Sequence, residues 1–550
     1  LATAITGATF SSTQNSNVVT VTKASHGLDV GEYITFTSVS LPGGGATGFT
    51  VANFQDFTFE ILTVPTTSTF TVQMKSNETG TGMSTAGGAT INPYEEIGPT
   101  IQTYGYGWGT STWSRLTWGS GSTTSSVILD PGTWSLDNFG QQLIATVKDG
   151  KTFVWNPGVS NPLENRAVVM SGAPTATRLT ITSDRDRHVV HFGTETTIGD
   201  ATTQDPMFIR FSDQENFSVY QPTSVNTAGT FRLDTGNKIV AAVSGKDYNL
   251  ILTDQAAYTM QFVGPPFTFS IRQVGSNCGC IGQHGVVYAD GRVYWMGSGG
   301  GFFVFDGTVK LLPSLVEDFV FTTTGSNVGV NYSSNEIIYA SHNSLFNEIN
   351  WFYPAGTPSG NPAVQNNRAV VYNYVENSWS TMSLARSSYA DASTYAVPYA
   401  TEYTSTNTPT IPNLSGATNT FGSSLYYAHE VGNNEVDLNG TTTAIPAYIQ
   451  SGDFDLPTEG DGEYILRLSR FLPDFKNLQG NAIVTIFLKN FPIDGGTSSQ
   501  LGPFTINSTT QKIDTRARGR LANIKIQNTA VDETWRFGTF RADVNPDGRR

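Results

Sequence analysis

The sequence predicts an all-β protein, because it combines a turn-rich composition, an absence of helical periodicity and many short strand patterns. Only 14% of the 550 residues are charged, aromatic residues make up 12%, and glycine contributes 56 residues. This composition is typical of a β protein with many turns. No segment shows the 3.6-residue periodicity of a long amphipathic helix. A chain of this length predicts roughly two to four domains.

Residues 1–95 predict a small N-terminal β module. Four stretches alternate apolar with polar residues or are rich in β-branched and aromatic residues, which is typical of short strands. The glycine-rich stretch Gly80–Gly88 predicts a flexible loop near the end of the module. The expected strands are Val18–Thr22, Tyr33–Phe36, Phe57–Leu62 and Thr69–Gln73.

Residues 96–400 predict a β-propeller. At least 16 strand patterns follow one another in about 265 residues, which corresponds to four to six four-stranded blades. A ring of blades leaves only short, protected edges, whereas an open sheet of this length would aggregate. The expected strands are Leu143–Val147, Thr152–Trp155, Leu179–Thr182, His188–Phe192, Pro206–Phe211, Ile239–Ser244, Tyr248–Thr253, Ala257–Phe262, Gly285–Ala289, Val293–Met296, Phe302–Phe305, Gly329–Tyr332, Glu336–Ser341, Ile349–Tyr353, Ala369–Tyr374 and Ser378–Met382.

The clearest blade pattern is Cys278–Pro313, a meander of three strand signals separated by Asp-Gly or glycine-rich turns. Asp290-Gly291 predicts a type I′ hairpin, because glycine adopts positive φ freely and aspartate tolerates it. Lys148–Trp155 repeats the same Asp-Gly and aromatic strand design, and Val371–Trp379 resembles a kelch-like blade. A degenerate repeat of meanders favours a propeller.

The last part of the chain predicts a loop-rich connection over residues 401–445 and a sandwich-like C-terminal β domain over residues 446–550. The charge changes there. Residues 512–550 hold nine Lys or Arg and five Asp or Glu, a balance of +4, whereas the whole chain has a net charge of −14. Residues 1–511 therefore carry −18. The mixed signs favour interfaces between subunits.

The overall charge argues against a surface that wraps DNA, since such surfaces neutralise phosphates with Lys and Arg. It does not exclude a pore along which DNA slides. No run of 18 apolar residues predicts a membrane span, and the first residues lack the pattern of a signal peptide. Because the chain starts without Met, we expect a processed or trimmed product. Cys278 and Cys280 are too close for an easy disulfide and too few for a zinc site.

The sequence predicts no catalytic residue, no cofactor site and no metal site. Gly150-Lys151-Thr152 resembles the end of a phosphate-binding loop, but it lies between strands and position 145 is Ala instead of Gly. No Gly-x-Ser-x-Gly motif is present. Asp130–Trp134 comes near a sialidase Asp-box but is one residue short, and Ile128 stands where that motif has Ser. Paired carboxylates for sugar hydrolysis are not assignable from the sequence.

Several polar groups have a structural and a functional interpretation. His188 and His191, three apart on a strand, should face opposite sides and act as ordinary polar residues. The aromatic and glycine-rich Tyr104–Gly121 is a binding patch or, more commonly, packing between sheets. The carboxylates of residues 453–463 form a calcium loop or, more simply, a solvated acidic turn; they are Asp453, Asp455, Glu459, Asp461 and Glu463.

The basic cluster Arg516, Arg518 and Arg520 has three possible uses. Its guanidinium groups can bind phosphate in a bidentate manner. They can equally pair with acidic residues across a subunit interface, or protect the edge of a sheet. The sequence leaves these alternatives open.

Several stretches, in their order along the chain, resemble the tail nozzle proteins of short-tailed bacteriophages, also called packaged-DNA stabilisation or tubular tail proteins. Val19–Phe36 is similar to a small β module that is often inserted in such phage proteins. The resemblance covers most of the chain. The stretches that carry it are Pro206–Thr235, Leu250–Phe262, Cys278–Pro313, Tyr426–Leu456 and Thr515–Arg550.

The resemblance implies a structural virion protein with no enzymatic activity. It implies a homo-hexamer at the distal end of the tail, with a propeller in each subunit. The ring would continue the DNA channel below the portal and the tail adaptor protein, retain the packaged genome, attach tail fibres or spikes, and pass double-stranded DNA at ejection into the host cell. No cofactor is implied, and DNA contact would not be sequence-specific. We expect the residues facing the channel to be acidic or neutral, because a basic lining would bind the phosphates.

Two alternatives belong to other functional classes. The first is a propeller-type glycan-binding or glycan-cleaving tail protein. The second is a secreted kelch-like binding module.

Overall fold

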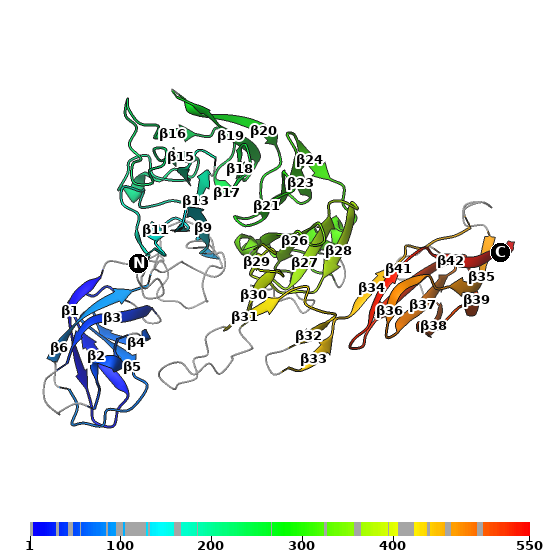
Figure 1. The fold of residues 1–550 in the computed structure, drawn as a ribbon, viewed down its shortest axis with the longest axis horizontal. Coiled ribbons are helices and arrows are strands. Elements are labelled where there is room, and N and C mark those ends of the chain that lie inside the picture. The colour runs from blue at the N-terminus through cyan, green and yellow to red at the C-terminus, as the bar shows by residue number, and fades with distance from the viewer. Residues whose placement is uncertain are drawn as a thin grey trace, which may run out of the picture. The chain divides into compact units, whose positions relative to one another are not determined.

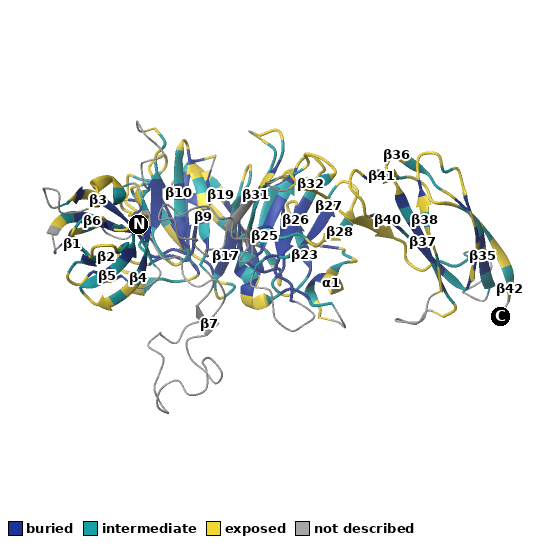
Figure 2. Ribbon diagram, turned by 90° about the horizontal axis from the view of Figure 1, so that it is seen from below, coloured by how far each residue is buried: buried dark blue, intermediate teal, exposed yellow. Residues whose placement is uncertain are grey.

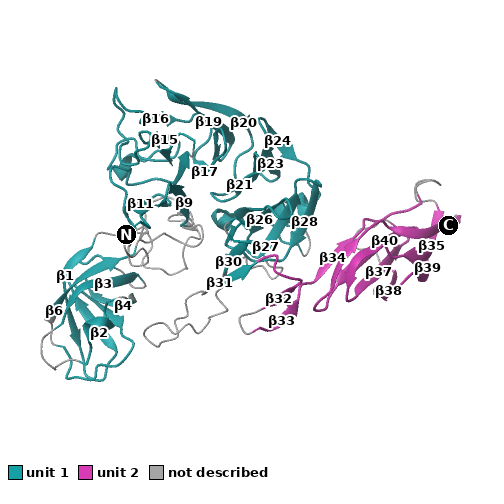
Figure 3. Cartoon of the chain, in the orientation of Figure 1, with its two compact units in different colours: residues 1–428 teal, residues 429–550 magenta. Residues whose placement is uncertain are grey.

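The computed structural model describes residues 4–28, 32–41, 48–55, 57–83, 86–94, 103–104, 128–129, 132–158, 167–183, 185–265, 267–323, 327–356, 365–393, 395–404, 423–436, 440–456, 464–491 and 499–549. Its regular elements are almost all β-strands, as the sequence predicts (Figure 1). The chain divides into two compact units, residues 1–428 and residues 429–550 (Figure 3).

The N-terminal module is a closed six-stranded antiparallel barrel with the strand order β1-β2-β5-β4-β3-β6, in which β6 pairs back with β1. A single turn of 3-10 helix, η1 (Val51–Asn53), precedes β4. Closure removes the exposed sheet edges that a free module of this size would have. The strands are β1 (Ile5–Ser12), β2 (Val18–Thr22), β3 (Tyr33–Ser40), β4 (Thr58–Thr66), β5 (Thr69–Gln73) and β6 (Ala86–Pro93).

The barrel interior is aromatic. In β2 and β5 the residues alternate between buried and partly exposed, so that Val19, Val21, Phe70 and Val72 point inward. The Phe10 and Phe36 rings meet edge to face, with centroids 5.1 Å apart. The alternating pattern in the sequence therefore correctly predicted which side chains of these half-buried strands face the interior.

The predicted loop Gly80–Gly88 is wrong at its end, because β6 begins at Ala86. Gly87 has φ +86° at a point where the pairing of β6 with β1 shifts register. A Cβ at this position would collide with the carbonyl oxygen of Ser40. Glycine is thus needed for a bulge within the strand, which its composition alone does not distinguish from a loop.

The rest of the first unit contains five four-stranded antiparallel sheets and one three-stranded sheet, the blades of the propeller. The first sheet holds β9 (Trp134–Phe139), β10 (Gln142–Val147), β11 (Thr152–Trp155) and β12 (Val168–Val169); the second, β13 (Leu179–Ser183), β14 (His188–Phe192), β15 (Phe208–Phe211) and β16 (Gly229–Arg232); the third, β17 (Ile239–Ser244), β18 (Asn249–Thr253), β19 (Ala256–Gly264) and β20 (Thr268–Ser276); the fourth, β21 (Val286–Ala289), β22 (Arg292–Met296), β23 (Phe302–Phe305) and β24 (Val309–Leu312); the fifth, β25 (Tyr339–Asn343), β26 (Glu348–Tyr353), β27 (Arg368–Asn373) and β28 (Ser378–Met382); the sixth, β29 (Ser388–Ala390), β30 (Tyr399–Thr404) and β31 (Ser423–Ala428).

The first strands of the six sheets, β9, β13, β17, β21, β25 and β29, lie next to one another in chain order. They and their neighbours carry most of the buried residues, whereas the outermost strands are largely exposed (Figure 2). Large aromatic side chains fill the space between successive sheets. Trp351 of β26, for example, packs against Phe302 of β23 with ring centroids 4.9 Å apart. This is the blade-on-blade packing expected of a propeller.

Short helical turns connect some of these strands, and one further pair of short strands lies ahead of the first sheet. They are β7 (Thr103–Tyr104), β8 (Ile128–Leu129), η2 (Ala201–Thr203), α1 (Glu317–Phe321) and η3 (Tyr332–Ile337).

The meander over Cys278–Pro313 forms the fourth blade. Asp290 and Gly291 have φ values of +49° and +76°, so the type I′ hairpin predicted between β21 and β22 is confirmed. The hairpin at Asp149-Gly150 differs. There only Asp149 has positive φ, and Gly150 instead forms an isolated bridge with Thr177 of the next blade.

The sequence prediction differs from the propeller in two ways. The predicted strands Gly329–Tyr332 and Glu336–Ser341 overlap with η3, and β25 starts only at Tyr339. The strands β9, β12, β16, β20, β24, β29 and β30 were not predicted. Of these, the outer strands β12, β16 and β24 are two to four residues long and mostly exposed, so they lack the alternation that marks a half-buried strand.

The second unit is a sandwich-like β domain. Three sheets enclose one apolar core that includes Leu466, Phe471, Val484 and Ile524. A separate two-stranded hairpin, β32–β33, precedes them. The strands are β32 (Asn434–Val436), β33 (Thr442–Ala444), β34 (Ala447–Gln450), β35 (Tyr464–Leu472), β36 (Phe475–Gln479), β37 (Ala482–Lys489), β38 (Ser499–Ile506), β39 (Ile513–Gly519), β40 (Leu521–Asn528), β41 (Thr534–Phe537) and β42 (Arg541–Arg549).

The predicted loop-rich connection over residues 401–445 contains more strand than expected. Its described parts hold the end of β30, all of β31 and the β32–β33 hairpin. β30 and β31 pair in register from Tyr399↔Ala428 to Thr404↔Ser423 and complete the sixth sheet. The described parts of this segment are therefore richer in strand than its polar composition indicates, while residues 405–422 lie outside the described residues.

Candidate functional site

The propeller contains a buried polar cluster where its inner strands meet. Lys148 follows β10 and Glu336 lies in η3, and their side chains form an ion pair with 2.8 Å between Nζ and Oε1. The two side chains are only 4% and 2% exposed. Lys238 Nζ lies 3.9 Å from the same Glu336 oxygen, and the backbone N–H of Gln283 donates to the other, Oε2, at 3.3 Å. Both carboxylate oxygens of Glu336 are therefore occupied by contacts within the chain.

The same cluster ties the first blade to the loop before β21. Thr133 Oγ1 donates to Gln283 Oε1 at 2.7 Å, and His284 Nε2 donates to the carbonyl of Trp134 at 2.9 Å. Burial lowers the pKa of His284, although the Trp134 carbonyl and the nearby Glu336 carboxylate oppose the shift. His284 thus stays neutral and acts as a fixed hydrogen-bond donor. The cluster functions as a clamp between strands far apart in sequence.

The clamp includes two residues of the stretch Asp130–Trp134, which resembles a sialidase Asp-box. Thr133 and Trp134 form part of the clamp, with the Thr133 hydroxyl committed to Gln283. Asp130 and Pro131 lie outside the described residues. Sequence reasoning did not single out Lys148 or Glu336, because each is an ordinary charged residue beside a turn and no local pattern marks the pair.

The phosphate-loop likeness at Gly150-Lys151-Thr152 is a hairpin end, as the sequence analysis argued. Thr152 begins β11, and its Oγ1 lies 2.8 Å from Thr146 Oγ1 on the paired strand. Thr146 is further bonded to Thr180 of the second blade at 2.8 Å. The threonine hydroxyls therefore join two blades.

His188 and His191 do point to opposite sides of β14. His188 packs against Phe211, Phe262 and Phe269, while His191 packs against Tyr220. Both histidines are completely buried, which the sequence analysis did not anticipate.

The two histidines have different polar partners. His188 Nδ1 lies 2.9 Å from Asp186 Oδ2, and its Nε2 lies 3.1 Å from Thr227 Oγ1. His191 Nδ1 lies 2.9 Å from Thr180 Oγ1. Burial, and then the positive charge of Arg210, lowers the pKa of His191 to about 3. Each histidine is therefore a hydrogen-bonded residue of the propeller core.

A small hollow adjoins the His188 side of the second and third blades. Its volume is about 10 Å³, at most enough for a single water molecule and far below the 300–1,000 Å³ of typical ligand sites. Its lining residues include Ser183, Asp186, Asp247 and Phe262. The Ser183 hydroxyl donates to Asp186 at 2.6 Å and Arg185 pairs with Asp247 at 3.2 Å, so both carboxylates of this lining have partners within the chain.

A second polar group lies nearer the surface, on the fifth and sixth blades. Asp391 Oδ2 lies 3.3 Å from His342 Nδ1, and His342 Nε2 lies 3.2 Å from the Tyr374 hydroxyl. Burial raises the pKa of Tyr374 and lowers that of His342. An aspartate, a histidine and a hydroxyl in series can move a proton, but a raised tyrosine pKa opposes a nucleophilic role. No sequence motif signals this group.

The two cysteines are buried and free. Burial raises the pKa of the Cys278 thiol to about 11 and that of the Cys280 thiol to about 12. The Cys278 carbonyl accepts a hydrogen bond from the indole N–H of Trp295 at 2.8 Å. Both residues therefore belong to the packing of the fourth blade.

In the second unit, a member of the acidic cluster and a member of the basic cluster each pair with a residue of opposite charge outside those clusters. Asp453 bonds Lys489 Nζ and Asn523 Nδ2, both at 2.8 Å, and its pKa is lowered by these two hydrogen bonds. Asp453 is thus an anchored carboxylate, unlike the solvated turn that was expected. Glu459, Asp461 and Glu463 lie outside the described residues, as does the part of Tyr104–Gly121 from residue 105 onward.

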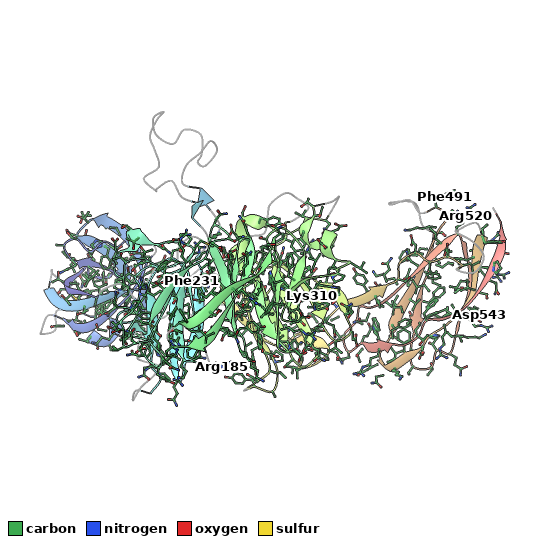
Figure 4. All side chains as sticks on the ribbon, turned by 90° about the horizontal axis from the view of Figure 1, so that it is seen from above. Arg185, Phe231, Lys310, Phe491, Arg520 and Asp543 are labelled. Atoms are coloured by element: carbon green, nitrogen blue, oxygen red, sulfur yellow. The ribbon has the colours of Figure 1, made fainter. Side chains whose placement is uncertain are left out.

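Arg516 and Arg518 lie on the exposed face of β39, which is an edge strand of its sheet. Arg518 Nε pairs with Asp547 Oδ2 at 2.8 Å. Arg520 follows this strand and lies over the Phe491 ring, 5.9 Å from its centroid (Figure 4). The position of Arg516 and Arg518 fits the protection of a sheet edge by charge.

Within the described residues, no three His, Cys, Asp or Glu side chains converge as metal ligands would. Among the same residues, no helix has the length and apolar character needed to cross a membrane.

No family model and no curated protein matches this chain. Solved structures with similar folds include apo AztD from Citrobacter koseri, at 11% identity and a TM-score of 0.27 over 69% of this chain and 96% of that one. The phage phi92 endosialidase gives 10% identity and a TM-score of 0.19 over 85% of this chain and 66% of that one. BBS1N in complex with ARL6DN gives 11% identity and a TM-score of 0.25; the match covers 42% of this chain and 63% of that one. Scores this low carry no functional argument.

Proposed function

We propose that this protein is a structural subunit of a short bacteriophage tail, the nozzle at the distal end of the virion. In this proposal six copies form a ring below the tail adaptor protein, attach fibres or spikes, retain the packaged DNA and pass it through the host cell surface at ejection. The proposal rests first on the ordered stretches that resemble tail nozzle proteins. Within the structure these stretches are framework: Cys278–Pro313 contains the fourth blade and Thr515–Arg550 contains most of β39 and all of β40–β42.

The observation that best supports a framework role is the buried clamp of Lys148, Glu336, Gln283 and His284. Propeller proteins that bind or cleave small ligands need polar groups that converge on an open cavity. In this clamp the carboxylate of Glu336 is 2% exposed and both its oxygens have partners. The polar side chains of the clamp bind one another and hold the blades together, as expected for the subunit of a rigid ring.

The charge of the chain supports passage of DNA rather than tight binding. A net charge of −14 leaves little cationic surface for counterion release, so phosphates would be repelled weakly. We expect the surface that faces the channel to be acidic or neutral. A continuous stripe of Lys and Arg along the channel would contradict this mechanism.

Class averages and a native mass of the purified full-length chain test the proposal. The expected result is a ring of six copies with an open centre wide enough for duplex DNA. A particle that stays a single chain of 59.3 kDa at every concentration would overturn the nozzle assignment.

A second candidate is a glycan-binding or glycan-cleaving tail protein. The group on this chain that such an enzyme would use is Asp391, His342 and Tyr374. Incubation with host surface polysaccharide, followed by measurement of reducing ends, separates the candidates. Release of reducing ends that disappears in Asp391→Asn and Tyr374→Phe, but persists in the exposed control Glu376→Gln, would favour the enzyme.

A further inference from the structure

The second unit begins with a segment that is exposed along nearly its whole length. Residues 429–450 contain the β32–β33 hairpin and β34, and we call this segment the arm. Every residue of β34 is exposed, and the hairpin buries none of its described residues. β34 pairs with β40 from Ala447↔Asn528 to Gln450↔Lys525. The hairpin is tied to the same domain through Asn434, whose Nδ2 donates to Asp532 Oδ1 and whose Oδ1 accepts from the Asp532 N–H at 2.8 Å. A two-stranded hairpin with both faces in water is marginally stable at best.

The arm is apolar as well as exposed. Five of its side chains and the adjacent Val531 are between 42% and 68% exposed. Summed over these side chains, the exposed surface is on the order of 600 Å², compared with the roughly 800 Å² that each partner buries in a standard interface. This surface lies on both faces of the edge strand, because Tyr448 and Ile449 are successive residues of β34. The side chains are Val431, Val436, Ile445, Tyr448, Ile449 and Val531.

The two edges of the sheet that contains β34 differ in how they are protected. β38, at one edge, contains Pro503, which has no N–H to donate, and a register shift in its pairing with β37. Proline and bulges are devices by which proteins prevent other strands from pairing with an edge. β34, at the other edge, has neither a proline within it nor a charged side chain, and it exposes Tyr448 and Ile449. This difference indicates that β34 is covered when the protein functions.

We propose that the arm docks on a second copy of this chain. Residues 440–452 carry no charged side chain, and the charged residues of the arm's first part, which include Glu430 and Glu435, are acidic, so the arm is not suited to binding DNA phosphates. Interfaces between identical subunits are more apolar than the rest of a protein surface. A marginal hairpin needs a cover that is present whenever the chain folds, and another copy meets that condition.

The first unit offers a different apolar patch that a neighbouring arm would meet. Leu345 and Phe346 in the β25–β26 turn and Val375 in the β27–β28 turn are all about half exposed or more. Asn373 Nδ2 donates to the Phe346 carbonyl at 3.0 Å and holds the two turns together. Contact between two different patches is heterologous, and such contacts build rings when the rotation closes. The inference deepens the proposed function, since a nozzle ring requires contacts of this type.

A triple substitution in the full-length chain, Val436→Ser with Tyr448→Ser and Ile449→Ser, tests the docking. Native mass and sedimentation should show the wild type as a multimer and the variant as a single chain with an unchanged circular dichroism spectrum. The matched control is Val225→Ser with Leu315→Ser and Tyr395→Ser, which removes apolar side chains elsewhere that are similarly exposed or more exposed. The control should keep the wild-type mass.

Thiol labelling provides a second readout that does not depend on how the variant folds. Both native cysteines are buried and have raised pKa values, so a cysteine introduced by Thr442→Cys is the reactive thiol to follow. Its maleimide labelling should fall at least tenfold between dilute and concentrated protein. A cysteine introduced by Val225→Cys should label equally at both concentrations.

The outcomes separate this inference from the function it builds on. If the wild type forms a ring but the arm variant keeps it and the thiol at position 442 stays reactive, the docking is wrong and the nozzle proposal stands. If the wild type is a single chain with a reactive thiol there, both are wrong. If it is a single chain with a protected thiol, the arm packs on its own chain, and both are again overturned.

Discussion

The propeller and the second unit both contain clusters of opposite charges, but they use them differently. Lys148 and Glu336 meet where the inner strands converge, and neither side chain is more than 4% exposed. Arg470 meets Asp514 at 3.0 Å and Asp543 at 3.6 Å on the outer face of a sheet, where all three side chains are about half exposed. The two clusters have comparable distances between their charged atoms, but the first is shielded from water and the second is exposed to it.

This difference teaches which charges define the fold. A buried pair has lost its hydration, so removing one partner leaves a charge with no compensation. An exposed pair exchanges one set of water contacts for another and gains little. Stability should therefore depend strongly on the clamp and weakly on the outer face, and four substitutions or conditions test this order.

Glu336→Gln should have the largest effect. It leaves the Lys148 ammonium buried beside a neutral amide and should cost about 3–5 kcal/mol. The apparent Tm of the first unit should fall by roughly 5–10 °C, measured by the fluorescence of its buried tryptophans. Glu376→Gln, at an exposed turn of the fifth blade, is the control and should leave Tm unchanged. The double variant Lys148→Met with Glu336→Met should recover most of the loss, because it removes both charges together.

Acidification should have the next largest effect, through His191. Burial and Arg210 depress the pKa of His191 to about 3 in the folded state, whereas the unfolded chain binds this proton near pH 6.5. The unfolded state therefore binds more protons below pH 6.5, so stability is full above that pH and is lost as the pH falls toward 3. The loss from this one group is about 1.4 kcal/mol per pH unit within that window.

His191→Gln tests the assignment. It should flatten the decline of Tm between pH 6 and pH 4, even if it lowers Tm at pH 7. An unchanged slope in this variant would mean that other groups govern the acid sensitivity of the propeller. The matched control His342→Gln, at a partly exposed site, should leave most of the slope intact.

Asp453→Asn should have a smaller effect, because its site is intermediate. The carboxylate bonds Lys489 and Asn523, and its side chain is 28% exposed. The substitution should cost about 0.5–1 kcal/mol. Since these bonds lower the pKa of Asp453, its contribution is present above the ordinary aspartate pKa and is lost as the pH falls through the lowered value. Urea unfolding of the second unit should show a larger difference between variant and wild type at pH 7 than at pH 3.

The sequence predicted the local features of the molecule well. Asp290-Gly291 specified its hairpin because positive φ at two successive positions restricts the residue type. β2 and β5 were predicted with the bounds that they have, since a half-buried strand imposes alternation on every residue. Such features are encoded within a few neighbouring positions.

The features that the sequence did not reveal depend on contacts between distant residues. The ion pair of Lys148 with Glu336 joins different blades, and neither residue stands in a motif. The β32–β33 hairpin was taken for part of a loop-rich connection, because its strands bury nothing within the chain and so carry no periodicity. A strand with one buried face alternates apolar and polar residues, and a strand that is exposed on both faces in the isolated subunit has no such alternation.

Asp514→Asn should have the smallest effect. It therefore tests whether an exposed pair of charges contributes to stability at all. Hydrogen bonds from Lys512 and then Arg470 lower the pKa of Asp514, yet water solvates and screens all three groups. Asp543→Asn, on the other side of Arg470, is the matched control, and neither variant should shift the unfolding midpoint of the second unit measurably. A drop comparable to that of Glu336→Gln, seen at high but not at low protein concentration, would contradict the comparison. It would mean that a partner covers this sheet face too, because only removal from water makes such a pair important.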